Sequence, residues 1–131
     1  MPEGDLALVD LFSGCGGLSA GLHRVGFRTV LANELHIDPA NTYIHNLMPN
    51  TPELMRVGPI QKQLSNTRIE KWMSEVDFEI DCLVGGPPCQ GFSMAGRGDP
   101  DDPRNSLFKE FLRVTGKVRP KSVIFENVPG F

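Results

Sequence analysis

Cysteine is scarce in this sequence, with three residues among 131, and no two of them are spaced as Cys-X-X-Cys. An odd number of thiols, in a chain without a recognisable signal peptide, indicates reduced cysteines and not a disulfide framework. The absence of Cys-X-X-Cys pairs also argues against the common structural zinc sites. We therefore expect a cytoplasmic protein that holds no metal ion.

Long apolar runs and an excess of positive charge are missing as well. The longest hydrophobic stretches cover only a handful of residues, so we expect no membrane-spanning helix and no membrane partner. Thirteen Lys and Arg stand against sixteen Asp and Glu, a formal net charge of −3, whereas a protein that grips duplex DNA unaided usually carries a basic surface. The remaining composition, 40% apolar and 22% charged residues, is typical of one globular domain.

Short apolar runs alternate with amphipathic segments along the chain. Strands are predicted at residues 6–12, 29–32, 82–84 and 122–125. Helices are predicted at 18–25, 38–46, 65–75 and 107–118, the second of them with Asp38 as N-cap and Pro39 at the first helical position. Residues 47–63 give poor signals, and periodicity shows no strand there. The repeated strand–helix order predicts an α/β fold with a doubly wound, mostly parallel sheet over residues 1–131.

The stretch DCLVGGPPCQGFS, residues 81–93, organises the chain. A buried strand at 82–84 is followed by Gly-Gly-Pro-Pro, which ends any strand and makes a rigid turn. Cys89 then comes just beyond the carboxyl end of that strand, where ligands bind in open parallel sheets. The alternative is that Cys89 is one more small buried hydrophobic residue. The rigid turn around it favours a reactive thiol.

A glycine-rich turn, SGCGG at 13–17, follows the first predicted strand and precedes a helix, an arrangement that brings backbone close to a ligand. Gly14 and Gly16 match the first two glycines of the dinucleotide fingerprint, but Ser19 stands at the third position, which weakens a nicotinamide interpretation. Glu34, about twenty residues later at a strand end, is placed to accept hydrogen bonds from ribose hydroxyls. The alternatives are a simple tight turn and a solvated carboxylate.

Two further features belong to the same predicted edge of the sheet. Glu126 follows the strand at 122–125, so it ends one strand away from Cys89. Residues 92–104, rich in Gly, Pro, Asp and Arg, are predicted to form a loop and are a candidate lid.

Five segments, VDLFSGCGGLSAGL, ANE, GGPPCQGFS, DPRNSLF and FENVPGF, resemble in this order and spacing the amino-terminal half of the cytosine-5 DNA methyltransferases. The resemblance covers nearly the whole chain, and GGPPCQGFS with a later ENV is its most specific part. It implies a Rossmann-like methyltransferase fold and S-adenosylmethionine as cofactor, with S-adenosylhomocysteine as product. It also implies double-stranded DNA with a flipped cytosine as partner, a role in restriction-modification and, in a bacterium, association with the nucleoid.

The resemblance assigns roles to individual residues. Cys89 matches the catalytic nucleophile, and Glu126 matches its partner on the cytosine ring. The expected cofactor-binding residues are Asp10, Phe12, Ser13, Gly14, Cys15, Gly16, Gly17, Leu18, Glu34, Leu35, Ile60, Pro88 and Leu107. The expected substrate-binding residues are Gln90, Ser93 and Asn127.

The implied chemistry explains why a cysteine and a carboxyl group are needed together. Position 5 of cytosine is too weak a nucleophile to take a sulfonium methyl group unaided, so the Cys89 thiolate adds to position 6. Glu126 binds the N3 and amino edge and stabilises the charge that develops. The base must leave the helical stack, and the loop at 93–105 is expected to close over it.

The sequence also departs from the family's pattern. Pro59 stands where the family commonly has an acidic residue that contacts the adenine amino group, and Leu35 or His36 stands where an aromatic residue often packs on the adenine. The family's later arginine-bearing segment, target-recognition region and terminal segment have no counterpart. We therefore expect a catalytic part that is incomplete at its carboxyl end, inactive alone, and dependent on a missing carboxyl-terminal half or a second subunit.

Three other functions stay open on the sequence alone. The chain is alternatively a truncated, non-catalytic module that binds a cofactor or a partner protein. An RNA cytosine-5 methyltransferase would share the same chemistry. A nicotinamide oxidoreductase is the weakest alternative, because the Pro-Pro-Cys-Gln turn has no role there.

Overall fold

The computed structural model describes residues 6–88 and 106–126. The described elements, in chain order, are β1 (Leu6–Leu11), α1 (Gly17–His23), β2 (Phe27–Glu34), α2 (Ile37–Leu47), the 3-10 helix η1 (Pro52–Leu54), β3 (Met55–Val57), α3 (Ile60–Gln63), α4 (Asn66–Glu75), β4 (Cys82–Gly85), α5 (Ser106–Val118) and β5 (Ser122–Phe125). The predicted strands and helices are all present, with ends that differ by a few residues. None of the helices in the described ranges is long and apolar enough to cross a membrane.

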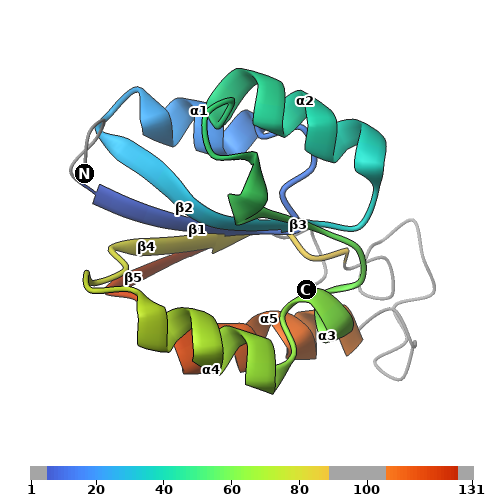
Figure 1. The fold of residues 1–131 in the computed structure, drawn as a ribbon, viewed down its shortest axis with the longest axis vertical. Coiled ribbons are helices and arrows are strands. Elements are labelled where there is room, and N and C mark those ends of the chain that lie inside the picture. The colour runs from blue at the N-terminus through green and yellow to red at the C-terminus, as the bar shows by residue number, and fades with distance from the viewer. Residues whose placement is uncertain (1–5, 89–105, 127–131) are drawn as a thin grey trace.

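The five strands form one sheet in the order β3-β2-β1-β4-β5, and every neighbouring pair runs parallel. Figure 1 shows α1 and α2 on one face of this sheet and α3, α4 and α5 on the other. The chain order reverses between β1 and β4, so the carboxyl ends of these two strands flank the switch point of the sheet. The predicted doubly wound α/β fold is confirmed.

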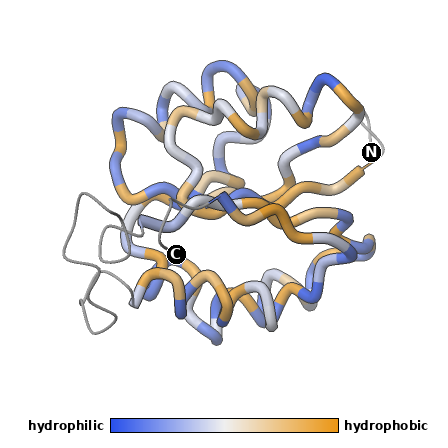
Figure 2. Tube along the Cα trace, turned by 180° about the vertical axis from the view of Figure 1, so that it is seen from behind, coloured by the Kyte–Doolittle hydropathy of each residue, from blue (hydrophilic) through white to orange (hydrophobic). Residues whose placement is uncertain are grey.

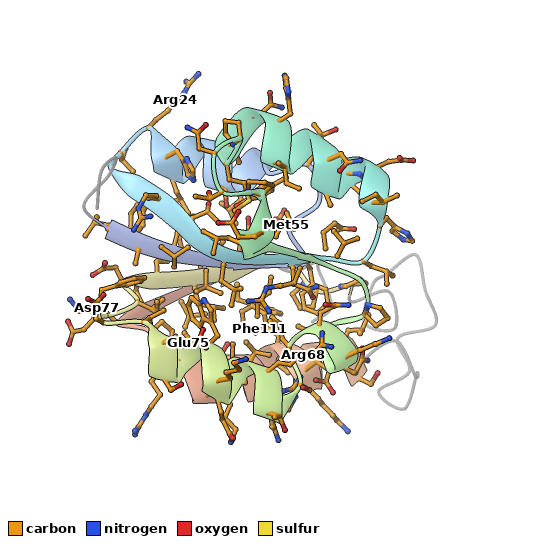
Figure 3. All side chains as sticks on the ribbon, viewed as in Figure 1. Arg24, Met55, Arg68, Glu75, Asp77 and Phe111 are labelled. Carbon is orange, nitrogen blue, oxygen red and sulfur yellow. The ribbon has the colours of Figure 1, made fainter. Side chains whose placement is uncertain are left out.

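The central strands form because their residues are apolar on both faces. In β1 every residue after Leu6 is buried, and all four residues of β4 are buried. Such near-continuous apolar runs are typical of parallel strands covered by helices on both sides. Figure 2 shows the hydrophobic residues gathered along the sheet. In Figure 3, Phe111 lies between the sheet and the helices α4 and α5, whereas Met55 lies on the face covered by α1 and α2.

β3 was not visible to sequence periodicity, because three residues are too few to show an alternating pattern. It is fixed by pairing with β2, where Ala32, Asn33 and Glu34 lie beside Met55, Arg56 and Val57.

The predicted start of α2 and its predicted capping residue were both wrong by two residues. The helix begins at Ile37 with His36 as N-cap, and Asp38 lies in the first turn instead of capping it. The cause is the side chain of Glu34, whose Oε2 accepts a hydrogen bond of 2.8 Å from the backbone N–H of His36. This contact takes up the His36 amide, so the chain turns into the helix directly after β2. For α4 the sequence offers Ser65 or Asn66 as the cap, and the structure has Ser65, whose Oγ accepts from the backbone N–H of Arg68.

Gly85, the last residue of β4, is predicted to tolerate no side chain. A β-carbon built there would lie 2.7 Å from the carbonyl oxygen of Leu11 and 2.7 Å from the ring of Phe111. We expect Gly85→Ala to lower the free energy of unfolding in urea by about 1–3 kcal/mol, the usual cost of overpacking. The matched control is Gly21→Ala in α1, where a β-carbon meets nothing within 4 Å. That change is expected to stabilise the helix by about 0.5–1 kcal/mol, and equal effects of the two changes would contradict the packing seen at Gly85.

Candidate active site

A pocket of about 310 Å³ opens at the carboxyl edge of the sheet. Four of its lining residues, Phe12, Leu35, Gly58 and Gly86, come directly after β1, β2, β3 and β4. The full described lining is Phe12, Gly14, Asn33, Glu34, Leu35, His36, Gly58, Pro59, Ile60, Gln61, Gly86, Pro88 and Leu107. The pocket therefore lies where parallel α/β sheets bind ligands. Seven of the predicted cofactor-binding residues line it: Phe12, Gly14, Glu34, Leu35, Ile60, Pro88 and Leu107.

Glu34 joins the glycine loop to the end of β2. Its Oε1 accepts a hydrogen bond of 3.0 Å from the backbone N–H of Gly14, and its Oε2 accepts one of 2.8 Å from the backbone N–H of His36. The side chain is nearly buried, with the residue 9% exposed. Each carboxylate oxygen has a second lone pair, so both oxygens can still accept from hydroxyl groups of a ligand. Glu34 is therefore more than a solvated strand-end carboxylate.

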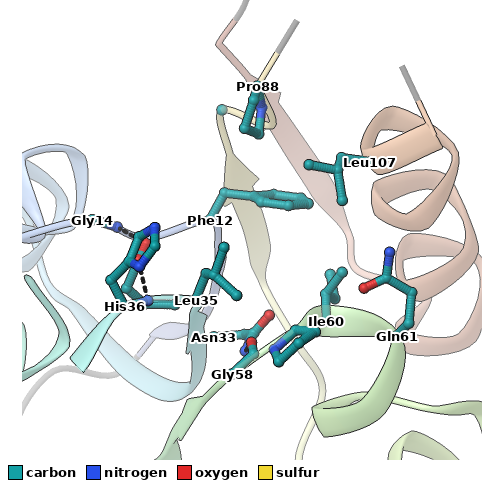
Figure 4. A pocket seen from close by; sticks show the side chains of 13 residues that line it. Phe12, Gly14, Asn33, Leu35, His36, Gly58, Ile60, Gln61, Pro88 and Leu107 are labelled. Carbon is teal, nitrogen blue, oxygen red and sulfur yellow. Dashed lines mark hydrogen bonds between the residues drawn. The ribbon is translucent and has the colours of Figure 1, made fainter. Parts of the chain in front are cut away.

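The glycine loop holds Phe12 in an uncommon conformation. Phe12 has a positive φ of 55°, and Gly14 follows with φ of 56°. The backbone N–H of Ser13 donates to the carbonyl oxygen of Asn33, which fixes the loop against β2. A positive φ is rare for a bulky residue and marks a position that its surroundings enforce. Here it places the Phe12 ring in the pocket, as Figure 4 shows.

The walls of the pocket are mostly apolar. Figure 4 shows Phe12, Leu35, Ile60 and Leu107 around the opening, with Pro88 above Phe12. These side chains come from five separate parts of the chain and meet only in the fold. Their arrangement suits a flat apolar group with a polar sugar attached, because the carboxylate of Glu34 stands at one end of the pocket.

The strands that precede Cys89 and Glu126 in the sequence, β4 and β5, are neighbours in the sheet. β5 pairs with β4, and the backbone N–H of Glu126 donates to the carbonyl oxygen of Gly85 at 3.0 Å. The Glu126 side chain lies beside Gly86, since a β-carbon built on Gly86 would be 3.4 Å from Glu126 Oε2. Pro88, the residue before Cys89 in the sequence, lines the pocket. Cys89, Gln90, Ser93 and Asn127, like the predicted loop at 92–104, lie outside the described residues.

The remaining predicted cofactor residues, apart from Asp10, belong to the glycine loop and the start of α1. None of them lines the pocket in the described part of the chain. Cys15, Gly17 and Leu18 are exposed, Ser13 is half-buried, and Gly16 is buried. A β-carbon on Gly16, whose φ is 96°, would lie 2.7 Å from side-chain atoms of both Tyr43 and Leu47. Gly16 is therefore required for α2 to pack closely against the loop.

Asp10 is buried behind the loop, with only 3% of its surface exposed. Its carboxylate accepts a hydrogen bond from Ser19 Oγ, which in turn accepts from the Tyr43 hydroxyl at 2.9 Å. The Tyr43 hydroxyl also contacts Thr29 Oγ1 at 2.9 Å, and Thr29 contacts His23 Nε2 at 2.8 Å. Burial raises the pKa of Asp10 from 3.8 to about 7, against the opposing effect of the Ser19 and Tyr43 hydrogen bonds. Ser19, which breaks the dinucleotide fingerprint, is a member of this network.

Comparison with known proteins shows which family the chain matches. The family model of the C-5 cytosine-specific DNA methylases matches residues 6–131. The chain belongs to that family. It is 40% identical to the type II methyltransferase M1.HphI of Haemophilus parahaemolyticus, over 94% of this chain and 32% of the relative. It is 44% identical to the type II methyltransferase M.AquIA of Picosynechococcus sp., over 94% of this chain and 48% of the relative.

A solved structure shows the same fold. A chain described as a DNA modification methyltransferase encoded within a prophage (E. coli) superposes with a TM-score of 0.72 and 38% identity, over 96% of this methylase chain and 33% of its own length. The chain thus spans between a third and a half of these proteins.

Asn33, Gln61 and Gly86 are among the pocket residues that the sequence did not indicate. Asn33 Nδ2 donates to the carbonyl oxygens of Arg56 and Gly58, and so it holds the end of β3 beside the pocket. The ANE segment drew attention to Glu34 alone, because the role of Asn33 depends on a strand that periodicity does not show.

Asp10 is predicted to make the stability of this methylase fall as pH rises. Because its folded-state pKa of about 7 is above the ordinary 3.8, the folded chain keeps a proton that the unfolded chain releases. The free energy of unfolding should therefore decrease between about pH 4 and 7, by at most about 1.4 kcal/mol per pH unit from this group. Asp10→Asn should remove that slope, measured as the difference between the two proteins in urea unfolding at pH 5, 6, 7 and 8. Parallel curves would contradict the assignment.

Burial lowers the pKa of His23, at the far end of the network, and this contributes a slope of the opposite sign. His23 is present in both proteins, so its contribution cancels in the difference between them.

Proposed function

We propose that this chain provides the S-adenosylmethionine pocket and the cysteine nucleophile of a DNA cytosine-5 methyltransferase of the restriction-modification type. The observation that carries the proposal is the Glu34 carboxylate, tied to Gly14 of the glycine loop, at the same sheet edge as Glu126 and the Gly-Gly-Pro-Pro segment that precedes Cys89 in the sequence. The relatives M1.HphI and M.AquIA are type II methyltransferases, which supports the reaction class.

The residues present fit an adenosine-type cofactor. The free lone pairs of Glu34 suit the two ribose hydroxyls, and Phe12, Ile60 and Leu107 offer apolar surface to a purine ring. When bound, the sulfonium group of the cofactor supplies an electrophilic methyl group. In our proposal, Asp10 and the buried side chains hydrogen-bonded to it do not contact the cofactor. Asp10 instead acts as a positioning residue, because it holds Ser19 and hence the first turn of α1 behind the glycine loop.

The nucleophilic step is assigned to Cys89. Its thiolate forms a bond to position 6 of the cytosine ring, and the electron pair of the 5,6 double bond moves to make position 5 nucleophilic. After position 5 is methylated, loss of its proton and of the thiolate restores the aromatic ring. Pro87 and Pro88 restrict the backbone directly before Cys89 in the sequence, and Pro88 lines the pocket at the sheet edge where the base would enter.

Glu126 is assigned to the opposite edge of the base. Its carboxyl group, when protonated, donates to ring atom N3, and its second oxygen accepts from the exocyclic amino group. These contacts stabilise the charge that develops when the thiolate adds. The described part of the chain favours this role, because Glu126 lies over Gly86, next to the Pro-Pro turn that leads to Cys89.

Methyl transfer from radiolabelled S-adenosylmethionine tests the proposal. The chain is assayed alone and together with the carboxyl-terminal part of M1.HphI, with duplex DNA and with transfer RNA as acceptors. We expect label in duplex DNA only when the carboxyl-terminal part is supplied, because M1.HphI is about three times as long as this chain. Label in transfer RNA and none in DNA would replace the proposed substrate. No label in either acceptor, with cofactor bound, would favour a non-catalytic module.

A further inference from the structure

A second hollow is formed by residues of β3 and α4. It has a volume of about 270 Å³ and is lined by Arg56, Arg68, Lys71, Trp72 and Glu75. Arg56 belongs to β3 and the other four residues belong to α4, and none of the five lines the pocket at the carboxyl edge of the sheet. We call it the basic hollow, because three of its five described side chains are cations in a chain whose net charge is −3.

The cations of the basic hollow have no acidic partner. Within residues 6–88 and 106–126, none of Arg56, Arg68 and Lys71 forms an ion pair with a carboxylate. On the neighbouring helix α5, by contrast, Lys117 pairs with Glu70 of α4 at 2.6 Å. Arg68 and Lys71 are one helical turn apart, a spacing at which like charges repel each other. An anion bound between the cations would offset this repulsion.

Trp72 adds an unused hydrogen-bond donor to the basic hollow. The residue is only 7% exposed, and its indole N–H donates to no acceptor in the described ranges. A buried indole N–H usually has a hydrogen-bond partner. Because arginine, lysine and tryptophan side chains offer donors and no oxygen or nitrogen acceptor, four of the five lining residues present donors alone. The ligand that matches such a lining is an anion with several acceptor oxygens.

Two of the cations are attached to positions that the fold fixes. The carbonyl oxygen of Arg56 accepts from Asn33 Nδ2 at 2.6 Å, so the backbone of Arg56 is tied to β2. Arg68 Nη1 donates to Gln63 Oε1 at 3.2 Å, which orients the guanidinium group. Its other side-chain N–H groups are unused in the described part of the chain. Figure 3 shows Arg68 and Glu75 toward opposite ends of α4, so the carboxylate of the lining stands away from this guanidinium group.

We propose that the basic hollow binds a phosphate group through Arg56, Arg68 and Lys71. A guanidinium group pairs with two phosphate oxygens at once, and the lysine ammonium group adds a point charge. The indole N–H of Trp72 supplies a further donor. The phosphate group belongs either to the backbone of a nucleic acid or to a free phosphorylated molecule, since both present the same oxygens. This binding does not require the methyl-transfer site, because no residue of the basic hollow lines the pocket.

The fluorescence of Trp72 measures the binding, because it is the single tryptophan of the chain and lines the basic hollow. The 131-residue chain is titrated with inorganic phosphate, and with potassium chloride at equal ionic strength to account for screening. We expect a saturable change with phosphate and none with chloride. Arg56→Gln and Lys71→Gln should each weaken phosphate binding by about 5–20-fold, as the loss of a charge-assisted hydrogen bond predicts.

Two further variants separate a binding role from a structural one. Lys109→Gln is the matched control, since Lys109 is an exposed cation of α5 that lines neither the pocket nor the basic hollow. It removes the same charge and should change phosphate binding by less than about twofold. Glu75→Gln removes the carboxylate of the lining and should strengthen phosphate binding by about 2–5-fold. Equal effects of Lys71→Gln and Lys109→Gln, or no saturable signal with phosphate, would overturn the proposal.

A duplex oligonucleotide of A·T pairs alone distinguishes the two sources of the phosphate group. It contains no cytosine, so its binding involves no target base, and it is titrated at several salt concentrations. For a backbone phosphate, Lys71→Gln should lower the slope of log affinity against log salt concentration by about one, and Lys109→Gln should not. If Lys71→Gln weakens inorganic phosphate and leaves duplex binding unchanged, the ligand is a free phosphorylated molecule. If it weakens neither, the basic hollow is no phosphate site.

Discussion

Covalent capture of DNA is expected to disappear when Cys89 is replaced by alanine. The experiment uses a chimaera in which this chain replaces the matched residues of M1.HphI, and duplex DNA with 5-fluorocytosine at the target. S-adenosylmethionine is supplied, so position 5 is methylated after the thiolate adds to position 6. Fluorine at position 5 then cannot leave as the proton does, so the thiolate is not eliminated and the adduct is seen as a band of increased mass on a denaturing gel. Without the thiol no adduct forms, and methyl transfer should drop by several orders of magnitude.

The other two cysteines provide matched controls for this experiment. Cys82 is 2% exposed within β4, and Cys15 is exposed in the glycine loop. Cys82→Ala and Cys15→Ala should both keep the adduct, and a peptide map should place the cross-link at Cys89. A cross-link at Cys15 would remove Cys89 as the nucleophile and leave the Gly-Gly-Pro-Pro turn without its proposed role.

Replacing Glu34 by alanine is expected to weaken binding of S-adenosylhomocysteine by about 10–100-fold in calorimetry. Two effects act together, because the ribose loses charge-assisted hydrogen bonds of about 1–3 kcal/mol and the glycine loop loses its bond from Gly14. Glu34→Gln should fall between the two proteins, since one of the two oxygens remains as an acceptor.

Glu53→Ala is the control for the charge itself. Glu53 is an exposed carboxylate in η1 that does not line the pocket, so its removal changes the net charge by the same amount as Glu34→Ala. Its effect on binding should be less than twofold. An unchanged affinity in Glu34→Ala, or an equal loss in Glu53→Ala, would remove Glu34 from the binding site.

The fold could be predicted because its central elements are strongly patterned. β1 and β4 are apolar on both faces and are bounded by glycine or proline, so their positions follow from sequence. β3 could not be predicted, because its three residues are held only by pairing with β2. The start of α2 was misplaced for a related reason: Asp38 and Pro39 form a good local capping signal, but the carboxylate of Glu34 binds the His36 amide first.

The residues of the candidate site could be predicted where a sequence motif lies at the end of a predicted strand. Gly14 and Glu34 are twenty residues apart in the chain, yet both follow from the expected strand–loop–helix–strand order, and the structure joins them directly. The side of the pocket formed by α3 was harder to predict from the sequence. Gln61 lines the pocket together with Leu107 of α5, and nothing in its local sequence indicates this position. Asp10 was expected beside the cofactor, whereas the structure buries it with Ser19, one layer behind the loop.

A crystal structure of this chain with S-adenosylhomocysteine tests the central claim most directly. The account predicts the ribose hydroxyls within hydrogen-bond distance of both oxygens of Glu34 and the purine between Phe12 and Ile60. It also predicts that the homocysteine sulfur faces the side of the pocket formed by Gly86 and Pro88, toward the turn that bears Cys89. A ligand bound elsewhere, such as the hollow lined by Arg56, Arg68 and Lys71, or a purine at the Glu34 end with its sugar toward Gln61, would contradict the account.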